Sequence, residues 1–477
     1  QPLTHIFNVS IESEIIPHSW KAAHVLPLHK DGPTNILNNY RPISKLPCLA
    51  KILEKLVSNQ IKSFLIKHSV LKPYQSGFRQ GHNYHTATTK VLNDIYAALD
   101  SRQECLALFI DLSKAFDSVN HQILLKQLQH IGFDKKAYNW FSNYLSNRTQ
   151  AVVADGFKSE FLITDKGVPQ GSILGPLLFT IFINSIGCNI KHSSIHLYAD
   201  DAILYTSAPS AGQAAQFLQE DFDEIQKSLI KLKLSLNTRK TKYMLFSKRQ
   251  EVQPLNIHTF DGTVIERVSS YKYLGFWLDE KLTFKTHVSK LCRSLKSKLS
   301  FYYRNKSCIP LNYRKEIVQA TFLSVLDYGD TVYMHTSLSV LKPLDAVYHS
   351  AIRFITGDKY RTHHCLLYDK VGWSSLTNRR EQHCILFIYK GLVGRLPDYL
   401  ACELNYSSSS YNTRSHDCLV LKNGLVKSDT GKRGFSYYAA HKWNELQRLL
   451  QLNSLVPLSH LKRLIFDMYK ENCTCFN

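Results

Sequence analysis

The chain has 477 residues, enough for several sub-domains with well-filled cores, and 44% of them are hydrophobic, which is ordinary for a globular protein. Its formal net charge of +21 is not ordinary, and it favours a polyanionic partner: nucleic acid first, an acidic membrane surface second. The longest apolar stretch, near 175–187, is too short and too polar to span a bilayer, so we expect no membrane partner.

The eleven cysteines are scattered and form no CxxC pair, which predicts reduced thiols in an intracellular protein and argues against a disulfide framework. No targeting signal is apparent. Several histidines and cysteines of the C-terminal part could ligate zinc, but their spacing fits no known finger, so we expect core or surface roles for them. They are His363, His364, Cys365, His383, Cys384, Cys402, His416 and Cys418.

The first hundred residues are expected to be mostly helical after an irregular start. Apolar residues recur at helical spacing over 51–68, and a glycine-bounded loop that carries Arg79 follows. Residues 105–111 (CLALFID) predict a buried strand that ends in a carboxylate, and a helix is expected soon after Ser113. The later elements expected are a hairpin over 151–164, a loop over 167–172, an apolar helix over 173–186, two short strands over 195–205, an amphipathic helix over 213–234 and strands over 243–247 and 271–279.

The stretch 281–315 carries ten Lys or Arg and no Asp or Glu, with an apolar stripe at helical spacing. The solvated face of a surface helix would explain the basic residues, but the lack of any balancing acid favours contact with nucleic acid. The side chains expected to make this contact include Lys290, Arg293 and Lys296. The rest of the chain is expected to be mostly helical.

Three acidic residues lie at the ends of predicted strands: Asp111, and Asp200 with Asp201 at a hairpin tip. If these strands are neighbours in one sheet, carboxylates of like sign lie within a few ångströms, which is unfavourable unless divalent cations neutralise them. Hard oxygen ligands with positions left open for phosphates suit Mg²⁺. Two such ions about 4 Å apart can perform nucleotidyl transfer. A polar turn without metal is the alternative.

The acid pair belongs to an ordered set of motifs. In chain order these are NYRPIS from Asn39, SGFRQGHNYHTAT from Ser76, FIDLSKAFDSVNH from Phe109, GVPQGSILGPLLF from Gly167, YADD from Tyr198, LNTRKTKYMLFS from Leu236 and YKYLGFWLD from Tyr271. The set resembles the reverse transcriptases of non-LTR (LINE-type) retrotransposons, including jockey-like lineages. The resemblance begins near Ile16, and the late segments RTHHCLLYDKVGW, NTRSHDC and AAHKWNEL extend it almost to the C-terminus.

The resemblance implies roles for the residues that match. Asp111 matches the first metal-binding aspartate, the carbonyl of Leu112 the backbone ligand beside it, and Asp200 with Asp201 the second ligand and its partner. The implied cofactor is a pair of Mg²⁺ ions, for which Mn²⁺ can substitute. Phe116 matches the aromatic gate under the sugar of the incoming nucleotide, which favours deoxynucleotides; a plain core aromatic is the alternative.

Further matches concern the nucleotide and the template. Gln170 and Gly171 match the loop against the templating base and the incoming nucleotide, where glycine permits close backbone approach. Arg79 matches a fingers residue expected to hold the triphosphate. Arg41 is expected on the template side, with an ordinary salt bridge as the alternative.

The last matches concern the leaving group and the primer. Lys240 matches the lysine proposed to protonate the leaving pyrophosphate as a general acid, and the nearby Lys242 is an alternative for that role. Leu274 and Gly275 fall in the motif that resembles the primer grip.

The implied fold is α+β: a right-hand polymerase with fingers, an antiparallel-sheet palm, a helical thumb and a mostly helical C-terminal extension. Because the sequence begins with Gln1 and not Met, we expect a fragment of a longer protein. The expected domains are a truncated N-terminal extension (1–23), fingers (24–104), palm with inserted fingers elements (105–280), basic helical thumb (281–345) and a C-terminal segment of unassigned role (346–477).

The implied function is RNA-directed DNA polymerase, which transfers dNTPs onto a primer 3′-hydroxyl in target-primed reverse transcription. The implied partners are an RNA template and a DNA primer, and the implied place of work is the nucleus. Nothing before His24 could hold the endonuclease that such elements usually encode upstream, so we expect template copying without nicking. The rival hypothesis is an inactive or domesticated copy that only binds nucleic acid.

Related polymerases fit less well. The residues after the Pro-Gln-Gly string, Ser172 to Pro176, favour the retrotransposon group over group II intron maturases. Ala199 and Phe116 argue against viral RNA-dependent RNA polymerases. Nothing in the sequence resembles the RNA-binding region of telomerase.

Overall fold

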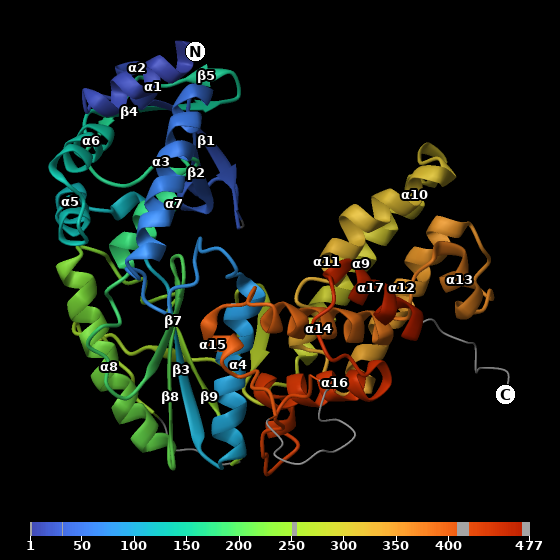
Figure 1. Ribbon diagram of the computed structural model, residues 1–477. Helices are drawn as coiled ribbons and strands as arrows, with labels where there is room; N and C mark the ends of the chain where they lie inside the picture. The colour runs from blue at the N-terminus through green and yellow to red at the C-terminus, as the bar shows by residue number, and fades with distance from the viewer. Residues whose placement is uncertain (1, 31, 250–254, 408–418, 470–477) are drawn as a thin grey trace.

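The computed structural model of this chain describes residues 2–30, 32–249, 255–407 and 419–469. Within these residues, two five-stranded sheets, a two-stranded sheet and many helices form two lobes (Figure 1). The N-terminal half makes one lobe, in which one five-stranded sheet lies above the other, and the helices from α9 (Lys285–Arg304) onward make most of the second lobe. The predicted α+β class is confirmed.

Helices make up most of the first hundred residues, as expected, but the first sheet corrects the expectation of an irregular start. The chain begins with two helices, α1 (Pro2–Glu12) and α2 (His18–Lys21), and the sheet then contains β1 (Ala22–His29), β2 (Tyr40–Lys45), β4 (Arg148–Ala154), β5 (Phe157–Lys158) and β6 (Leu162–Thr164). β1 pairs antiparallel with β2 and parallel with β4. The sequence hides both early strands because each contains a proline, Pro27 or Pro42, and because β1 depends on a partner far along the chain.

The second sheet carries the predicted acidic strands. Its strands are β3 (Glu104–Ile110), β7 (Ser194–Tyr198), β8 (Asp201–Ala208), β9 (Lys242–Phe246) and β10 (Glu266–Arg267). Their order is β10-β9-β3-β8-β7, antiparallel except between β9 and β10. The central strand β3 is buried throughout, and its alternate residues belong to two different hydrophobic cores, so both faces of the sheet are covered.

A helix packs on each face of this sheet, as Figure 1 shows. On one face α8 (Ala211–Lys231) buries Leu218, Phe222 and Ile225, which recur at helical spacing, against Leu106 and Leu108 of β3. On the other face α4 (Tyr84–Asp100) contributes residues to the core that contains Phe109. The two helices therefore hold the strands of this sheet in place from both faces.

Most predicted elements lie within a few residues of their expected bounds. They include α3 (Cys48–Lys67), α7 (Leu174–Ile183) and the 271–279 region, which is a hairpin of β11 (Ser270–Tyr273) and β12 (Phe276–Asp279). The helix expected soon after Ser113 begins later: a 3-10 turn (Phe116–Ser118) comes first, followed by α5 (His121–His130) and α6 (Lys135–Leu145). Asn120 sets this start, because its side chain accepts a hydrogen bond of 3.0 Å from the Ile123 amide.

The chain beyond α9 is mostly helical, as predicted. Its helices are α10 (Leu311–Val318), α11 (Ser324–Leu326), α12 (Leu338–Thr356), α13 (His364–Val371), α14 (Leu376–Leu392), α15 (Asp398–Ala401), α16 (Phe435–Leu450) and α17 (Leu458–Met468). A third hydrophobic core joins α14, α16 and α17 around the fully buried Trp443. No described helix is both long enough and apolar enough to cross a bilayer.

Candidate active site

The three predicted carboxylates lie at one end of the second sheet. β3 and β8 pair antiparallel with Ile110 opposite Ala202, so the next pair in register is Asp111 opposite Asp201. Asp200 lies in the tight turn between β7 and β8, where Tyr198 pairs with Asp201. Asp111 and Asp201, which are 90 positions apart in the sequence, are thus neighbours across two strands.

Asp111 is held by residues that precede β9. Its amide donates to Thr241 Oγ1 (3.2 Å), its carboxylate accepts from Asn237 Nδ2 (2.9 Å), and its carbonyl accepts from the Asn237 amide (2.9 Å). Leu112 forms a β-bridge with Leu236 in the same stretch. These bonds fix both the backbone and the side chain of Asp111 at the end of the strand.

Negative charge at the sheet end is incompletely balanced. The pKa of Asp201 is raised to about 6, first by burial among the surrounding protein and then by the charges of Asp200 and Asp111. Burial also raises the pKa of Asp111, against the lowering effect of Lys240. Among the described residues, the three carboxylates do not bring one oxygen each within 4.8 Å of the others, so they lie side by side without forming a closed cage. Such an arrangement suits added cations.

The turn that carries Asp200 is supported by the loop before α4. Ala199 in this turn has a positive φ of 59°. Gly77 approaches it so closely that a Cβ on Gly77 would lie 2.3 Å from the Ala199 amide nitrogen. The Ser76 amide donates to Leu197 O (2.8 Å), which joins this loop to β7. Only a residue without a side chain therefore fits at position 77.

Arg79 lies in the same loop and is half-buried. Its Nη1 donates to the carbonyls of Lys72 (3.0 Å) and Gln75 (2.9 Å). Burial lowers the pKa of the guanidinium, against the raising effect of Tyr399 and Asp398. Arg79, the residue predicted to bind the triphosphate, therefore lies in a loop beside the turn that carries Asp200.

Phe116 is half-buried between two other rings. It stacks on Phe179 of α7 at a centroid distance of 4.4 Å and meets Phe78 edge-on at 6.5 Å. Its carbonyl accepts from the Val168 amide (2.9 Å). The ring therefore joins the strand end, the loop before α4 and the loop at 167–172.

The loop at 167–172 is fixed on two sides. Gln170 Nε2 donates to Asp117 Oδ1 (2.9 Å), and Gln170 O accepts from the Ser44 amide (2.6 Å). Gly171 has φ 125°, and a Cβ there would lie 2.4 Å from Ser44 O. Ser44, Asp117 and Gln170 also line a pocket next to this loop.

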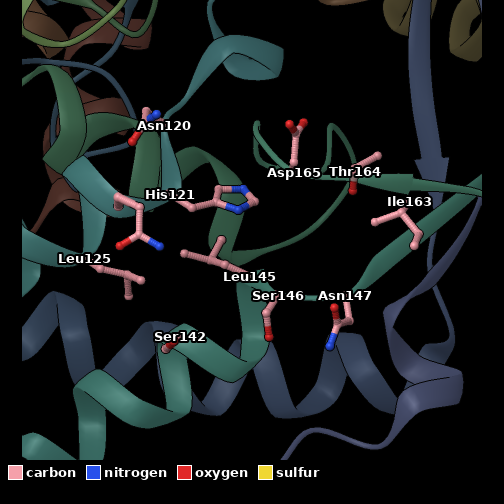
Figure 2. Close-up of a pocket in the computed structure, with 11 residues that line it drawn as sticks. Asn120, His121, Leu125, Ser142, Leu145, Ser146, Asn147, Ile163, Thr164 and Asp165 are labelled. Atoms are coloured by element: carbon pink, nitrogen blue, oxygen red, sulfur yellow. The ribbon is translucent and has the colours of Figure 1, made fainter.

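A second pocket adjoins the start of this loop (Figure 2). It is lined by Asn120, His121, Ser146, Thr164 and Asp165, among others, and none of the three carboxylates lines it. His121 Nε2 donates to the carbonyl at position 167 (2.7 Å), and burial lowers the pKa of the ring. His121 therefore holds the start of the loop in place through this hydrogen bond.

The basic candidates near the carboxylates differ in their contacts. Lys240 is exposed and its charge acts on Asp111, whereas Lys242 Nζ lies 2.6 Å from Glu266 Oε2. Arg41 is exposed on β2, and its charge acts on Asp201. The structure thus distinguishes Lys240 from Lys242.

The hairpin of β11 and β12 lies next to the sheet end. Leu274 (φ 45°) and Gly275 (φ 90°) form its tight turn, and Leu274 O accepts from Tyr328 Oη (3.0 Å). Tyr271 stacks on Phe109 at 4.1 Å, and burial, then Asp201 and Asp111, raise its pKa to about 12. The hairpin is therefore within electrostatic reach of the carboxylates.

The basic residues of α9 lie on its exposed side. Lys290, Arg293 and Lys296 are all exposed. Lys290 Nζ lies 3.0 Å from the centroid of the Trp277 ring on β12, a cation–π contact that joins α9 to the hairpin. The described contacts of Arg293 and Lys296 do not connect them to the carboxylates.

Sequence reasoning missed the residues that hold the predicted ones. Asn237, Thr241, Asp117, His121 and Tyr271 all lie within the quoted motifs, but no role was assigned to them. Their function depends on bonds across the sheet or between loops, such as the one from Asn237 to Asp111 across 126 positions. Local pattern carries no signal for such contacts.

Two other clusters have metal-ligand geometry. One atom each from His363, His364 and Cys365 lies within 4.8 Å of the others, while His416 and Cys418 lie outside the described residues. Asp327, Asp330 and His383 form a similar group, but Arg379 pairs with Asp327 (2.5 Å) and His383 with Asp330 (2.7 Å). His383 and Asp330 therefore already bond each other within the protein.

Two comparisons with known proteins, one with family models and one with individual sequences, point to the same family. The family described as reverse transcriptase (RNA-dependent DNA polymerase) matches residues 28–278. The chain is 28% identical over 392 residues to the probable RNA-directed DNA polymerase from transposon BS of Drosophila melanogaster, covering 80% of this chain and 43% of that protein. It is 30% identical over 369 residues to the RNA-directed DNA polymerase from mobile element jockey of Drosophila melanogaster, covering 75% and 40%. The chain thus spans less than half the length of these relatives.

Among solved structures, the chain is similar to telomerase from Candida albicans in complex with the TWJ fragment of telomeric RNA. The TM-score is 0.40 and the identity 12%, with 77% of this chain and 68% of that chain covered. A likeness at this TM-score carries no inference about fold or function.

The close approach of Gly77 to the turn generates the first prediction. Gly77→Ala should displace the turn that carries Asp200, because its Cβ would lie 2.3 Å from the Ala199 nitrogen. We expect dTTP incorporation on poly(rA)/oligo(dT) to fall about 100-fold, the loss that a misplacement of about 1 Å can cause.

The matched control is Gly212→Ala. Gly212 lies in α8, and a Cβ there meets nothing within 4 Å, so this variant should incorporate dTTP like the wild type. Equal activity of the two variants would show that the contact at Gly77 does not position the turn.

Proposed function

This chain belongs to the reverse transcriptase (RNA-dependent DNA polymerase) family, and we propose that it is the RNA-directed DNA polymerase of a non-LTR retrotransposon. It has the α+β right-hand polymerase fold of that family. The observation that carries the proposal is the register of β3 and β8, which sets Asp111 and Asp201 side by side at the end of the sheet. The implied reaction adds dNTPs to a primer 3′-hydroxyl on an RNA template.

Asp111, Asp200 and Asp201, with the carbonyl of Leu112, would hold two divalent ions, Mg²⁺ or its substitute Mn²⁺. The unbalanced negative charge, seen in the raised pKa of Asp201, fits this role. When bound, such ions activate the attacking hydroxyl and stabilise the leaving pyrophosphate. Asn237 and Thr241 would hold Asp111 in the orientation that this role needs.

The incoming nucleotide would contact residues from three segments. Arg79 would bind the triphosphate, since its loop lies beside the turn with Asp200. Phe116 would exclude a 2′-hydroxyl, because Phe179 backs its ring and leaves it little freedom to move away. Gln170 and Gly171 would lie against the templating base, on a loop that Ser44 and Asp117 fix in place.

Lys240 would donate a proton to the oxygen of the leaving pyrophosphate. Two observations favour it over Lys242: the charge of Lys240 acts on Asp111, and Lys242 is paired with Glu266 at 2.6 Å. A general acid has to be near the leaving oxygen and free to release its proton.

An RNA template and a DNA primer are the proposed partners. We assign the template side to Arg41, the fingers to residues 24–104, the palm with inserted fingers elements to 105–280 and the basic helical thumb to 281–345. Leu274 and Gly275 would grip the primer, and Lys290, Arg293 and Lys296 on α9 would contact phosphates. Target-primed synthesis on chromosomal DNA would take place in the nucleus.

The ligand assignment is tested by Asp200→Asn. This variant keeps the shape of the turn but removes a charge that cations need, so incorporation of dTTP on poly(rA)/oligo(dT) should be abolished. Template–primer affinity should stay within about twofold of the wild type, since phosphate contacts elsewhere dominate it. Asp155→Asn, at the exposed tip of the β4–β5 hairpin, is the control with the same charge change.

Incorporation by Asp200→Asn at the rate of the control would refute the assignment. If the wild type binds template–primer but incorporates nothing with either Mg²⁺ or Mn²⁺, the chain is instead a nucleic-acid binder without polymerase activity.

The sugar gate is tested by Phe116→Val. Removing the ring should raise the efficiency with UTP relative to dTTP by roughly 10- to 100-fold, the range expected when a pocket stops excluding one hydroxyl. Phe116→Tyr keeps a ring stacked on Phe179 and should keep the discrimination. Unchanged selectivity in Phe116→Val would show that the gate lies elsewhere.

A further inference from the structure

Tyr399 joins the C-terminal segment to the loop that carries Arg79. It lies on α15, which Figure 1 shows beside the N-terminal part of α4. The Tyr399 hydroxyl lies 2.9 Å from Ser76 Oγ and 3.2 Å from Thr86 Oγ1. Ser76 belongs to the loop, and Thr86 to the first turn of α4. The Tyr399 hydroxyl therefore connects the C-terminal segment to residues that lie more than 300 positions earlier in the sequence.

The direction of each hydrogen bond in this network follows from Thr86. Its hydroxyl donates to Asn83 O (2.9 Å), so Tyr399 has to donate to Thr86. Ser76 then donates to Tyr399, and Ser76 Oγ is left to accept from His82 Nδ1 (3.0 Å) and His196 Nε2 (2.9 Å).

Both histidines are neutral, so each has one ring N–H, and these bonds require it on Nδ1 of His82 and on Nε2 of His196. Burial lowers the pKa of His82 to about 4 and that of His196 to about 3. Ser76 is fully buried, so its proton needs the acceptor that Tyr399 supplies. The ring of Tyr399 also packs edge-on against His82 (5.5 Å) and His196 (5.2 Å).

This network lies next to the proposed nucleotide site. Ser76 precedes Gly77, which touches the turn with Asp200, and Arg79 follows three positions after Ser76. His196 lies on β7, two residues before the end of that strand. A shift of Ser76 would therefore move the loop that carries the Arg79 guanidinium, while the pairing of β7 with β8 holds the turn with Asp200 in place.

The C-terminal segment is anchored along α4 at further points. Asp100 accepts from the Lys427 amide (2.9 Å) and from Ser428 Oγ (2.6 Å), and Asn93 Oδ1 accepts from the Ser436 amide (2.9 Å). Together with the contact of His383 Nδ1 with Asp330 (2.7 Å), these contacts hold the segment against α4 and against the stretch that carries Asp330. The position of Tyr399 is thus set by several contacts that do not involve the loop.

We propose that the C-terminal segment completes the nucleotide-binding side of the polymerase, with Tyr399 as a positioning residue that holds the loop of Ser76 and Arg79. This inference rests on the proposed function. It gives residues beyond 346 a role in binding dNTPs, through Arg79, and leaves the chemical step to the carboxylates.

The test is Tyr399→Phe in the full chain, with dTTP titrated on poly(rA)/oligo(dT). Loss of one buried hydrogen bond should raise KM for dTTP by roughly 5- to 50-fold. The kcat and the template–primer Kd should stay within about twofold, because the interaction lost acts on nucleotide binding and not on the transition state alone. Tyr389→Phe is the control, since its hydroxyl bonds Val456 O inside the C-terminal core, away from the loop.

An unchanged KM in Tyr399→Phe, or an equal rise in Tyr389→Phe, would overturn the inference. Hydrogen exchange of the amides at 76–81 gives a readout that needs no activity: exchange should be faster in Tyr399→Phe than in wild type or control, and equal exchange would also overturn it. A wild type that incorporates no dTTP would refute the proposed function alone, which keeps the two failures apart.

Discussion

The site depends on placing like charges side by side. Asp111 ends β3, Asp201 begins β8, and the antiparallel register of these strands makes them neighbours, with Asp200 in the adjoining turn. The pKa of Asp201, raised to about 6, reflects burial and this repulsion. A sheet covered on both faces by α4 and α8 keeps the strand ends from separating to relieve it. Divalent cations would relieve the repulsion instead, and that need links the fold to the proposed nucleotidyl transfer.

Supporting contacts converge on the same sheet end from distant parts of the chain. Asn237 and Thr241 hold Asp111, Gly77 lies against the turn of Asp200, and Ser44 holds the loop of Gln170. Tyr399 adds the C-terminal segment to this set. The backbone, a short polar group or, for Tyr399, the hydroxyl of a rigid ring makes each contact, so flexible side chains do not absorb small displacements. Residues far from the chemistry are therefore expected to influence it.

Local pattern was sufficient for the strand at 105–111, for the acidic hairpin and for the long amphipathic helices, since each buries apolar residues at its own period. The early strands were missed because Pro27 and Pro42 resemble breakers and β1 pairs with β4 more than a hundred positions later. The roles of Asn237 and Tyr399 depend on contacts across 126 and 323 positions, which no local pattern encodes. Likewise, Lys242 is separated from Lys240 by its pairing with Glu266 and by the action of the Lys240 charge on Asp111, neither of which the local sequence encodes.

Binding of Mn²⁺, followed by electron paramagnetic resonance, tests the shared-cation site most directly. The wild type would be titrated with dTTP and a template–primer that ends in a dideoxynucleotide, so that no bond can form. We expect two bound ions per complex in the wild type and a loss of at least one in Asp111→Asn, at equal template–primer occupancy. The same number of ions and the same affinity in both proteins would contradict a metal site built from the two strands.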